Sequence, residues 1–174
     1  TMRSANAARL SVYTPERITI GIRIPSPHSV LSILDQDEHY VAVNKPAGLL
    51  VHRTKMDRPE TRFALQLLRD QIGDHVFPVH RLDKPTSGVL VFGRTPRDAA
   101  ALSSSFEARN VEKRYLAIVR GYVAEQDRIV HPVSTERGKL EAITGYRRLA
   151  TVELPHAVGR YETARYSLVI AIPE

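Results

Sequence analysis

The chain of 174 residues contains no cysteine, which excludes disulfide bonds and thiolate metal sites. No stretch approaches the run of about 18 apolar residues that a membrane-spanning helix needs. The N-terminus also lacks the apolar central region of a secretory signal. These absences predict a soluble protein that makes no membrane contact and resides in the reducing cytoplasm.

Acidic residues are in shorter supply than basic ones. The chain has 19 Asp and Glu against 25 Lys and Arg, a net charge of +6 and a sequence pI near 9.8. The imbalance is also local, because the segment from His80 to Arg97 holds four Lys or Arg residues and Asp83 as its one acid. An excess of positive charge suits a polyanionic partner such as a nucleic acid.

The length and the 43% hydrophobic content are typical of one folded domain with a substantial core. Residues 1–29 show no clear periodicity and end at two prolines, Pro25 and Pro27, which discourage regular structure. We interpret residues 1–29 as an N-terminal arm or extension and residues 30–174 as the main folded domain.

Strand patterns outnumber helix patterns and do not alternate regularly with them, which predicts an α+β fold with a mixed, mostly antiparallel sheet and flanking helices. The expected strands are 40–44, 49–52, 76–79, 89–92, 111–123, 145–152 and 164–172. One helix is expected over 61–72, with Gly73 at its end. A second should start after the N-cap Thr95 and run to about Arg109.

The segment from His80 to Gly88 lies between two of the expected strands and invites two interpretations. In the simpler one it is a turn in which the Asp83 side chain accepts backbone N–H groups and Pro85 restricts the chain. In the other, a rigid loop presents a functional carboxylate within a basic groove, whose cations keep that carboxylate ionised. The residues by themselves leave both open.

The same segment resembles the signature H-R-L-D-x-x-T-S-G of the RluA family of pseudouridine synthases, with all seven fixed residues present. Two further segments agree with family motifs in order and spacing, and the resemblance extends over about residues 30–174. They are Val43-Asn44-Lys45-Pro46-Ala47-Gly48 followed by Val51-His52, and Lys113-Arg114-Tyr115 followed by Val119 and Gly121. The resemblance implies the pseudouridine synthase catalytic fold.

The resemblance also implies site residues and a partner. Asp83 would be the catalytic residue, Arg81 would guard the space left by a flipped-out nucleotide, and Tyr115 would pack against the flipped uracil. The partner would be structured RNA, with no obligate protein partner. The isomerisation involves no redox change, so no cofactor is implied, and His52 and the other histidines lack the spacing of a metal site.

Several stretches resemble the family members that modify uridine 65 of tRNA, which makes tRNA the expected substrate. They are His52-Arg53, Asp57-Arg58, residues 68–73 and residues 159–166. Two alternatives stay open, namely a family member that acts on ribosomal RNA and a non-catalytic RNA-binding module. The phosphate contacts would come from Arg62, Lys84, Arg94, Arg97 and Arg109.

In the family, the strand that ends here in Glu174 is followed by a T-G-[RK]-x-H-Q-[IL]-R segment, whose basic residue pairs with the catalytic Asp. The 174 residues do not contain that segment. We therefore expect a catalytic domain that is incomplete at its C-terminal side.

Overall fold

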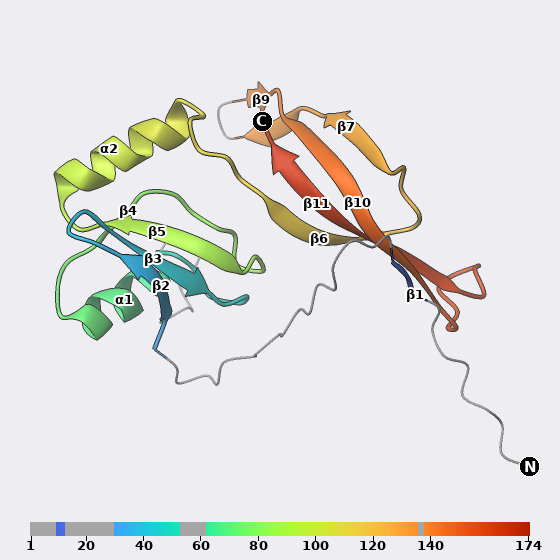
Figure 1. Ribbon diagram of the computed structural model, residues 1–174, viewed down its shortest axis with the longest axis horizontal. Helices are drawn as coiled ribbons and strands as arrows, with labels where there is room; N and C mark the ends of the chain where they lie inside the picture. The colour runs from blue at the N-terminus through green and yellow to red at the C-terminus, as the bar shows by residue number, and fades with distance from the viewer. Residues whose placement is uncertain (1–9, 13–29, 53–61, 136–137) are drawn as a thin grey trace, which may run out of the picture. The chain divides into compact units, whose positions relative to one another are not determined.

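The computed structural model describes residues 10–12, 30–52, 62–135 and 138–174 (Figure 1). The chain divides into two compact units. Unit 1 comprises residues 1–20 and 112–174, and unit 2 comprises residues 21–111. Within the described ranges, no helix is long and apolar enough to cross a membrane.

Unit 2 is a four-stranded antiparallel sheet with two helices. Its strands follow the order β2-β3-β5-β4. The elements are β2 (Ser32–Gln36), β3 (Tyr40–Lys45), α1 (Ala64–Ile72), β4 (Phe77–Pro78), β5 (Gly88–Gly93) and α2 (Pro96–Glu107). Val41 and Val43 of β3 and Leu90 and Phe92 of β5 are fully buried and form the centre of its core.

The expected strand over residues 49–52 is wrong, because this segment caps a helix instead. Leu50 forms only an isolated bridge to Phe63, with parallel direction. The carbonyls of Leu50 and Val51 accept hydrogen bonds from the N–H groups of Ala64 and Leu65, at 2.8 and 3.0 Å. These are first-turn N–H groups of α1, which have no partner within their own helix. The segment is thus engaged by α1 and not by a strand ladder.

Both expected helices are confirmed, and both are shorter than predicted. Gly73 closes α1 with φ of 70°. The Thr95 hydroxyl caps α2 by accepting from the N–H of Asp98 at 3.1 Å, as its position before Pro96 predicts. In Figure 1 α2 lies beside β4 and β5. The absence of a side chain at Gly93 permits this approach, since a Cβ there would lie 2.5 Å from the backbone nitrogen of α2 residue Ala99.

Unit 1 is a twisted antiparallel sheet in the order β1-β10-β11-β6, and β7 also pairs with β10. Its strands are β1 (Leu10–Val12), β6 (Tyr115–Arg120), β7 (Gln126–Val130), β10 (Ile143–Leu154) and β11 (Ala164–Pro173), and β8 (Val133–Thr135) pairs separately with β9 (Gly138–Leu140). The strand expected over 111–123 forms only as β6: residues 111–114 lie outside it, and Gly121 at φ 89° turns the chain out of the sheet after Arg120. Residues 10–12, inside the segment interpreted as an extension, form β1 and pair with β10.

The strands of both units pair antiparallel, and two helices accompany the sheet of unit 2. The expectation of an α+β fold with a mostly antiparallel sheet is therefore confirmed.

Candidate active site

The loop between β4 and β5 is anchored at two points before it reaches Asp83. Leu82 is 7% exposed and packs into the core of unit 2. His80 is held from two sides, since its Nε2 accepts the backbone N–H of Val91 at 3.1 Å and its ring stacks on Phe106 of α2 at 4.5 Å between centroids. The pairing of β4 with β5 stops at Pro78. The His80 ring therefore accepts the hydrogen bond of the Val91 N–H in β5, beyond the point where β4 pairs with that strand.

His80 is therefore a structural residue of the loop. A ring nitrogen that accepts a hydrogen bond carries no proton, which favours the neutral tautomer protonated on Nδ1. No group of three or more His, Asp or Glu side chains in the described ranges could hold a metal ion.

Asp83 itself projects from this anchored loop into solvent. Its carbonyl accepts the N–H of Thr86 at 3.0 Å, which closes a turn over residues 83–86. Its side chain is 75% exposed and that of Arg81 is 66% exposed, and the Arg81 guanidinium lies 3.6 Å from the Asp83 carboxylate. That separation permits charge attraction but exceeds a good hydrogen bond. Main-chain contacts thus hold the loop, while both charged groups remain accessible to a ligand.

A buried cation, Lys45, lies beneath the loop. It ends β3 on the same inward face as Val41 and Val43, and it is 0% exposed. Its Nζ donates to the carbonyls of Leu49 at 2.6 Å, Pro46 at 3.1 Å and, more weakly, Lys84 at 3.5 Å. These three carbonyl acceptors satisfy the three N–H groups of the ammonium, and no carboxylate among the described residues is in contact with it.

The Lys84 carbonyl also accepts the N–H of Gly48 at 2.7 Å. Through these hydrogen bonds Lys45 connects the turn after β3 to the turn that begins at Asp83. Burial lowers the pKa of Lys45, and the negative charge of Asp83 partly opposes that effect. The sequence analysis named Lys45 only as part of the segment from Val43 to Gly48 and assigned it no role in the site. The available signal was its spacing of two and four residues from valines of one strand face.

The third predicted site residue, Tyr115, is the first residue of β6 and is half-buried. It belongs to unit 1, where it pairs with Ala171. Arg81 and Asp83 belong to unit 2. Within one unit, the structure therefore brings together Arg81 and Asp83 of the three predicted site residues, and it adds Lys45 and His80 beside them.

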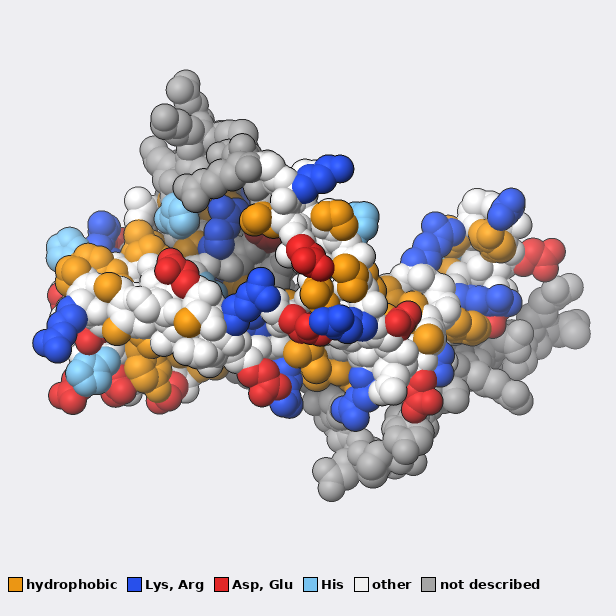
Figure 2. Space-filling view, turned by 90° about the horizontal axis from the view of Figure 1, so that it is seen from above, with side chains coloured by type: hydrophobic (Ala, Val, Ile, Leu, Met, Phe, Trp, Pro, Cys, Tyr) orange, Lys and Arg blue, Asp and Glu red, His pale blue; other side chains and the backbone are white. Residues whose placement is uncertain are grey.

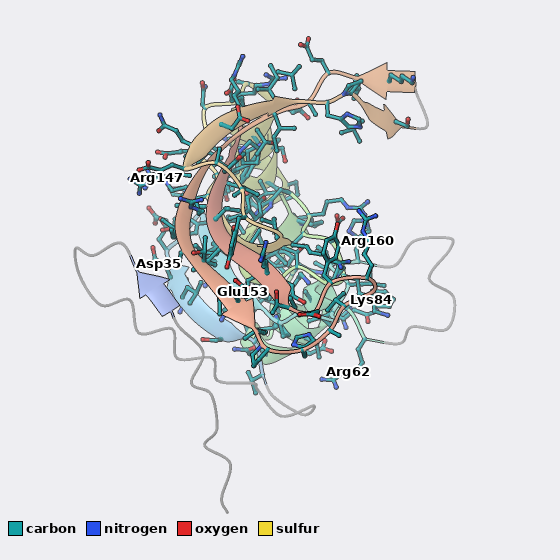
Figure 3. The ribbon with its side chains drawn as sticks, turned by 90° about the vertical axis from the view of Figure 1, so that its right-hand side faces the viewer. Asp35, Arg62, Lys84, Arg147, Glu153 and Arg160 are labelled. Atoms are coloured by element: carbon teal, nitrogen blue, oxygen red, sulfur yellow. The ribbon has the colours of Figure 1, made fainter. Side chains whose placement is uncertain are left out.

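The predicted phosphate contacts are on the surface of unit 2, except that Arg94 is partly buried and donates to Gln36 at 3.2 Å. In Figure 3, Lys84 and Arg62 lie on the right of the view and Asp35 on the left. Figure 2 shows Lys and Arg side chains interspersed with acids on the visible face. Arg53, Asp57 and Arg58, which contributed to the substrate prediction, lie outside the described residues.

The family model for RNA pseudouridylate synthases matches residues 39–173, which include the loop, Lys45 and Tyr115. The chain belongs to the RNA pseudouridylate synthase family. It is 50% identical over 155 residues to the tRNA pseudouridine synthase C of Haemophilus ducreyi, covering 83% of this chain and 64% of that protein. It is 51% identical over 156 residues to the enzyme of the same name from Haemophilus influenzae, covering 83% and 65%.

Two solved structures of human pseudouridylate synthase domains resemble the fold of this chain. Human RNA pseudouridylate synthase domain containing 4 superposes with a TM-score of 0.59 at 25% identity and covers 82% of this chain and 58% of that one. Human RNA pseudouridylate synthase domain containing 1 superposes with a TM-score of 0.65 at 22% identity, which supports the fold. The chain spans about 64% of the length of the bacterial relatives it matches.

Proposed function

We propose that this chain supplies the catalytic centre of an RNA pseudouridine synthase and that Asp83 is its catalytic carboxylate. One observation carries the proposal: the Asp83 side chain is 75% exposed on a loop whose backbone is held by buried neighbours. A surface carboxylate with no function needs no such support beneath it. Rigid placement of an accessible reactive group is what catalysis by positioning requires.

The chemistry suits a carboxylate. Converting uridine into pseudouridine breaks the bond from N1 of uracil to C1′ of ribose, rotates the uracil, and joins C5 to C1′. C5 loses its proton and N1 gains one, so the reaction balances without an oxidant or reductant. Asp83 can act as a nucleophile or as a base toward the sugar, and its negative charge stabilises positive charge that develops at C1′.

Arg81 and Tyr115 complete the proposal. A base within an RNA stem must leave the stack before a side chain can reach its sugar. The planar Arg81 guanidinium, beside Asp83, can stack in the vacated space and bond a phosphate through two N–H groups at once, a geometry that a Lys ammonium does not offer. The half-buried ring of Tyr115 offers a stacking face for the flipped uracil.

We further propose that the substrate is tRNA and that the target is uridine 65. Support comes from the two Haemophilus relatives, whose names specify tRNA and whose identity to this chain is about half. The reaction takes place in the cytoplasm, where tRNA is modified.

The test uses the protein produced from the whole gene, the 174-residue chain by itself, and the variant Asp83→Asn, which keeps the shape of the side chain and removes its charge. Asp74→Asn is the matched control, because Asp74 is an exposed carboxylate in the turn after α1 of the same unit. Each is incubated with tRNA and with ribosomal RNA that lack pseudouridine, and carbodiimide-primer extension locates the product.

We expect one new pseudouridine in tRNA, at uridine 65, and a rate that falls more than about a thousandfold in Asp83→Asn but not in Asp74→Asn. Product in ribosomal RNA alone would overturn the substrate proposal and leave the chemistry intact. RNA binding with no product from the whole protein would identify a non-catalytic RNA-binding module. Full activity of Asp83→Asn would remove Asp83 from the mechanism.

A further inference from the structure

The turn between β10 and β11 is a rigid protrusion of unit 1. Val158 and Tyr161 exchange two backbone hydrogen bonds, at 2.9 and 3.2 Å, around the two residues Gly159 and Arg160. Gly159 has φ of 61° at the first central position, which a tight turn of type II′ requires. Figure 1 shows this end of the β10–β11 hairpin extending past β6 and β1. The strand register agrees with this view, because β6 pairs with β11 only as far as Tyr166 and the hairpin continues beyond that residue.

The turn presents a cation stacked on an aromatic ring. The Arg160 guanidinium carbon lies 5.2 Å from the Tyr161 ring centroid, and Arg160 donates to the Tyr161 hydroxyl at 3.0 Å. Tyr161 is 55% exposed. This is the one side-chain hydrogen bond of Arg160 within the described part of the chain, so most of its five N–H donors face solvent.

A polar cluster stiffens the base of the hairpin. The Glu153 carboxylate accepts from Thr163 at 2.5 Å, from the Tyr122 hydroxyl at 3.0 Å and from Arg165 at 3.2 Å. The Arg165 guanidinium also lies over the Tyr122 ring at 5.4 Å. Figure 3 shows Glu153 on the strand and Arg160 at the far end of the protrusion. The cluster crosslinks both strands with the segment after β6, so the turn is held in place before any ligand arrives.

We propose that the hairpin tip, residues 158–161, is an RNA-binding site that stacks an unpaired base on Tyr161 and bonds the adjoining phosphate through Arg160. The proposal rests on the proposed function for the identity of the partner as RNA. A ring face with a neighbouring guanidinium is the combination that takes a single-stranded nucleotide without reading its sequence. Glu162 follows directly and offsets the charge of Arg160. Stacking, and not net charge, therefore supplies most of the affinity.

The test measures binding of a fluorescent unmodified tRNA transcript, a short oligouridine and a fully paired RNA duplex. The variants are Tyr161→Ala, Tyr161→Phe and Arg160→Gln, all in the Asp83→Asn background so that no turnover disturbs the equilibrium. Arg69→Gln is the matched control, because Arg69 is an exposed, ion-paired arginine of α1. Thermal unfolding confirms that each variant is folded.

We expect Tyr161→Ala to weaken binding of tRNA and oligouridine about tenfold, or ~1.4 kcal/mol, and to leave the duplex unaffected. Tyr161→Phe should bind as well as the parent, because the ring face remains. Arg160→Gln should lower the slope of log affinity against log salt by about 0.7–0.9, the value for one phosphate contact. Arg69→Gln should change neither quantity.

Equal binding of tRNA by Tyr161→Ala and its parent would overturn the proposal, and so would an equal loss for the duplex. Failure of the enzymatic proposal has a different signature, since it shows as absence of pseudouridine with the unmutated protein. If the unmutated protein modifies tRNA and Tyr161→Ala binds tRNA as tightly as its Asp83→Asn parent, the hairpin site alone is refuted.

Discussion

Replacing Lys45 with methionine tests how the loop that carries Asp83 is held. Methionine has a similar length and fills the space among the buried valines, but it donates no hydrogen bond. The carbonyls of Leu49 and Pro46 then lose their 2.6 and 3.1 Å partners. The Lys84 carbonyl keeps its hydrogen bond from Gly48.

The expected loss of stability follows from these contacts. A hydrogen bond to a charged group contributes about 1.5–3 kcal/mol, so two short ones contribute about 4 kcal/mol together. Removing a buried charge returns part of that, because burial of the ammonium group is itself costly, at about 2 kcal/mol here. Lys45→Met should therefore lower the free energy of unfolding by about 2 kcal/mol. Loosening the loop by about 1 Å should lower kcat by about a hundredfold.

The pH dependence has a definite sign. The pKa of Lys45 in the folded protein is lowered from 10.5 by burial, so between the lowered value and 10.5 the unfolded chain binds more protons than the folded one. The contribution of Lys45 to stability therefore rises with pH across that window. The stability gap between the parent and Lys45→Met should widen there.

Urea unfolding at a series of pH values and single-turnover modification of tRNA measure these effects. Lys139→Met is the comparison variant, since Lys139 is an exposed lysine of β9, and it should leave stability within about 0.5 kcal/mol. Parent-like stability and parent-like kcat for Lys45→Met would refute the inference that Lys45 holds the loop. A loss of stability with unchanged kcat would restrict its role to folding.

Two further changes test other parts of the structure. His80→Phe keeps a ring to stack on α2 but leaves the Val91 N–H without its acceptor, so urea unfolding should show a loss of about 1–3 kcal/mol. Glu153→Gln tests the polar cluster at the base of the hairpin. Hydrogen bonds from Thr163, and then from Tyr122 and Arg165, lower the pKa of Glu153 in the folded protein. The stability that the Glu153 carboxylate contributes is therefore present above the unfolded pKa of 4.5 and is lost as the pH falls through the lowered folded pKa. In acid titrations followed by circular dichroism, Glu153→Gln should be less stable near neutrality and converge with the parent at low pH.

Each change has a matched comparison. His75→Phe alters an exposed histidine of unit 2 and should leave unfolding unchanged, whereas an equal loss in both variants would argue against the hydrogen bond to Val91. Glu162→Gln removes an exposed carboxylate near the hairpin tip. If Glu162→Gln and Glu153→Gln alter the acid limb equally, the polar cluster does not stabilise the hairpin.

Short-range patterns in the sequence predicted much of the fold. Thr95 before Pro96 located the start of α2, and Gly73 located the end of α1, because caps depend on residues within one turn. The strand on each side of the Asp83 loop was also predicted, since alternation and turn residues act locally. The same reasoning failed for residues 49–52, because the carbonyls of Leu50 and Val51 bond to the first residues of a helix that lies further along the chain.

The sequence by itself determined the class of fold, the family and the loop that carries Asp83, because these follow from local propensities and a motif of adjacent residues. Only the tertiary structure decided that Lys45 is buried and that His80 completes a strand ladder. The Lys45 ammonium group reaches a carbonyl 39 residues along the chain, and the His80 ring reaches an N–H 11 residues away. Whether a polar group is buried with partners depends on such distant contacts, which local propensity does not encode.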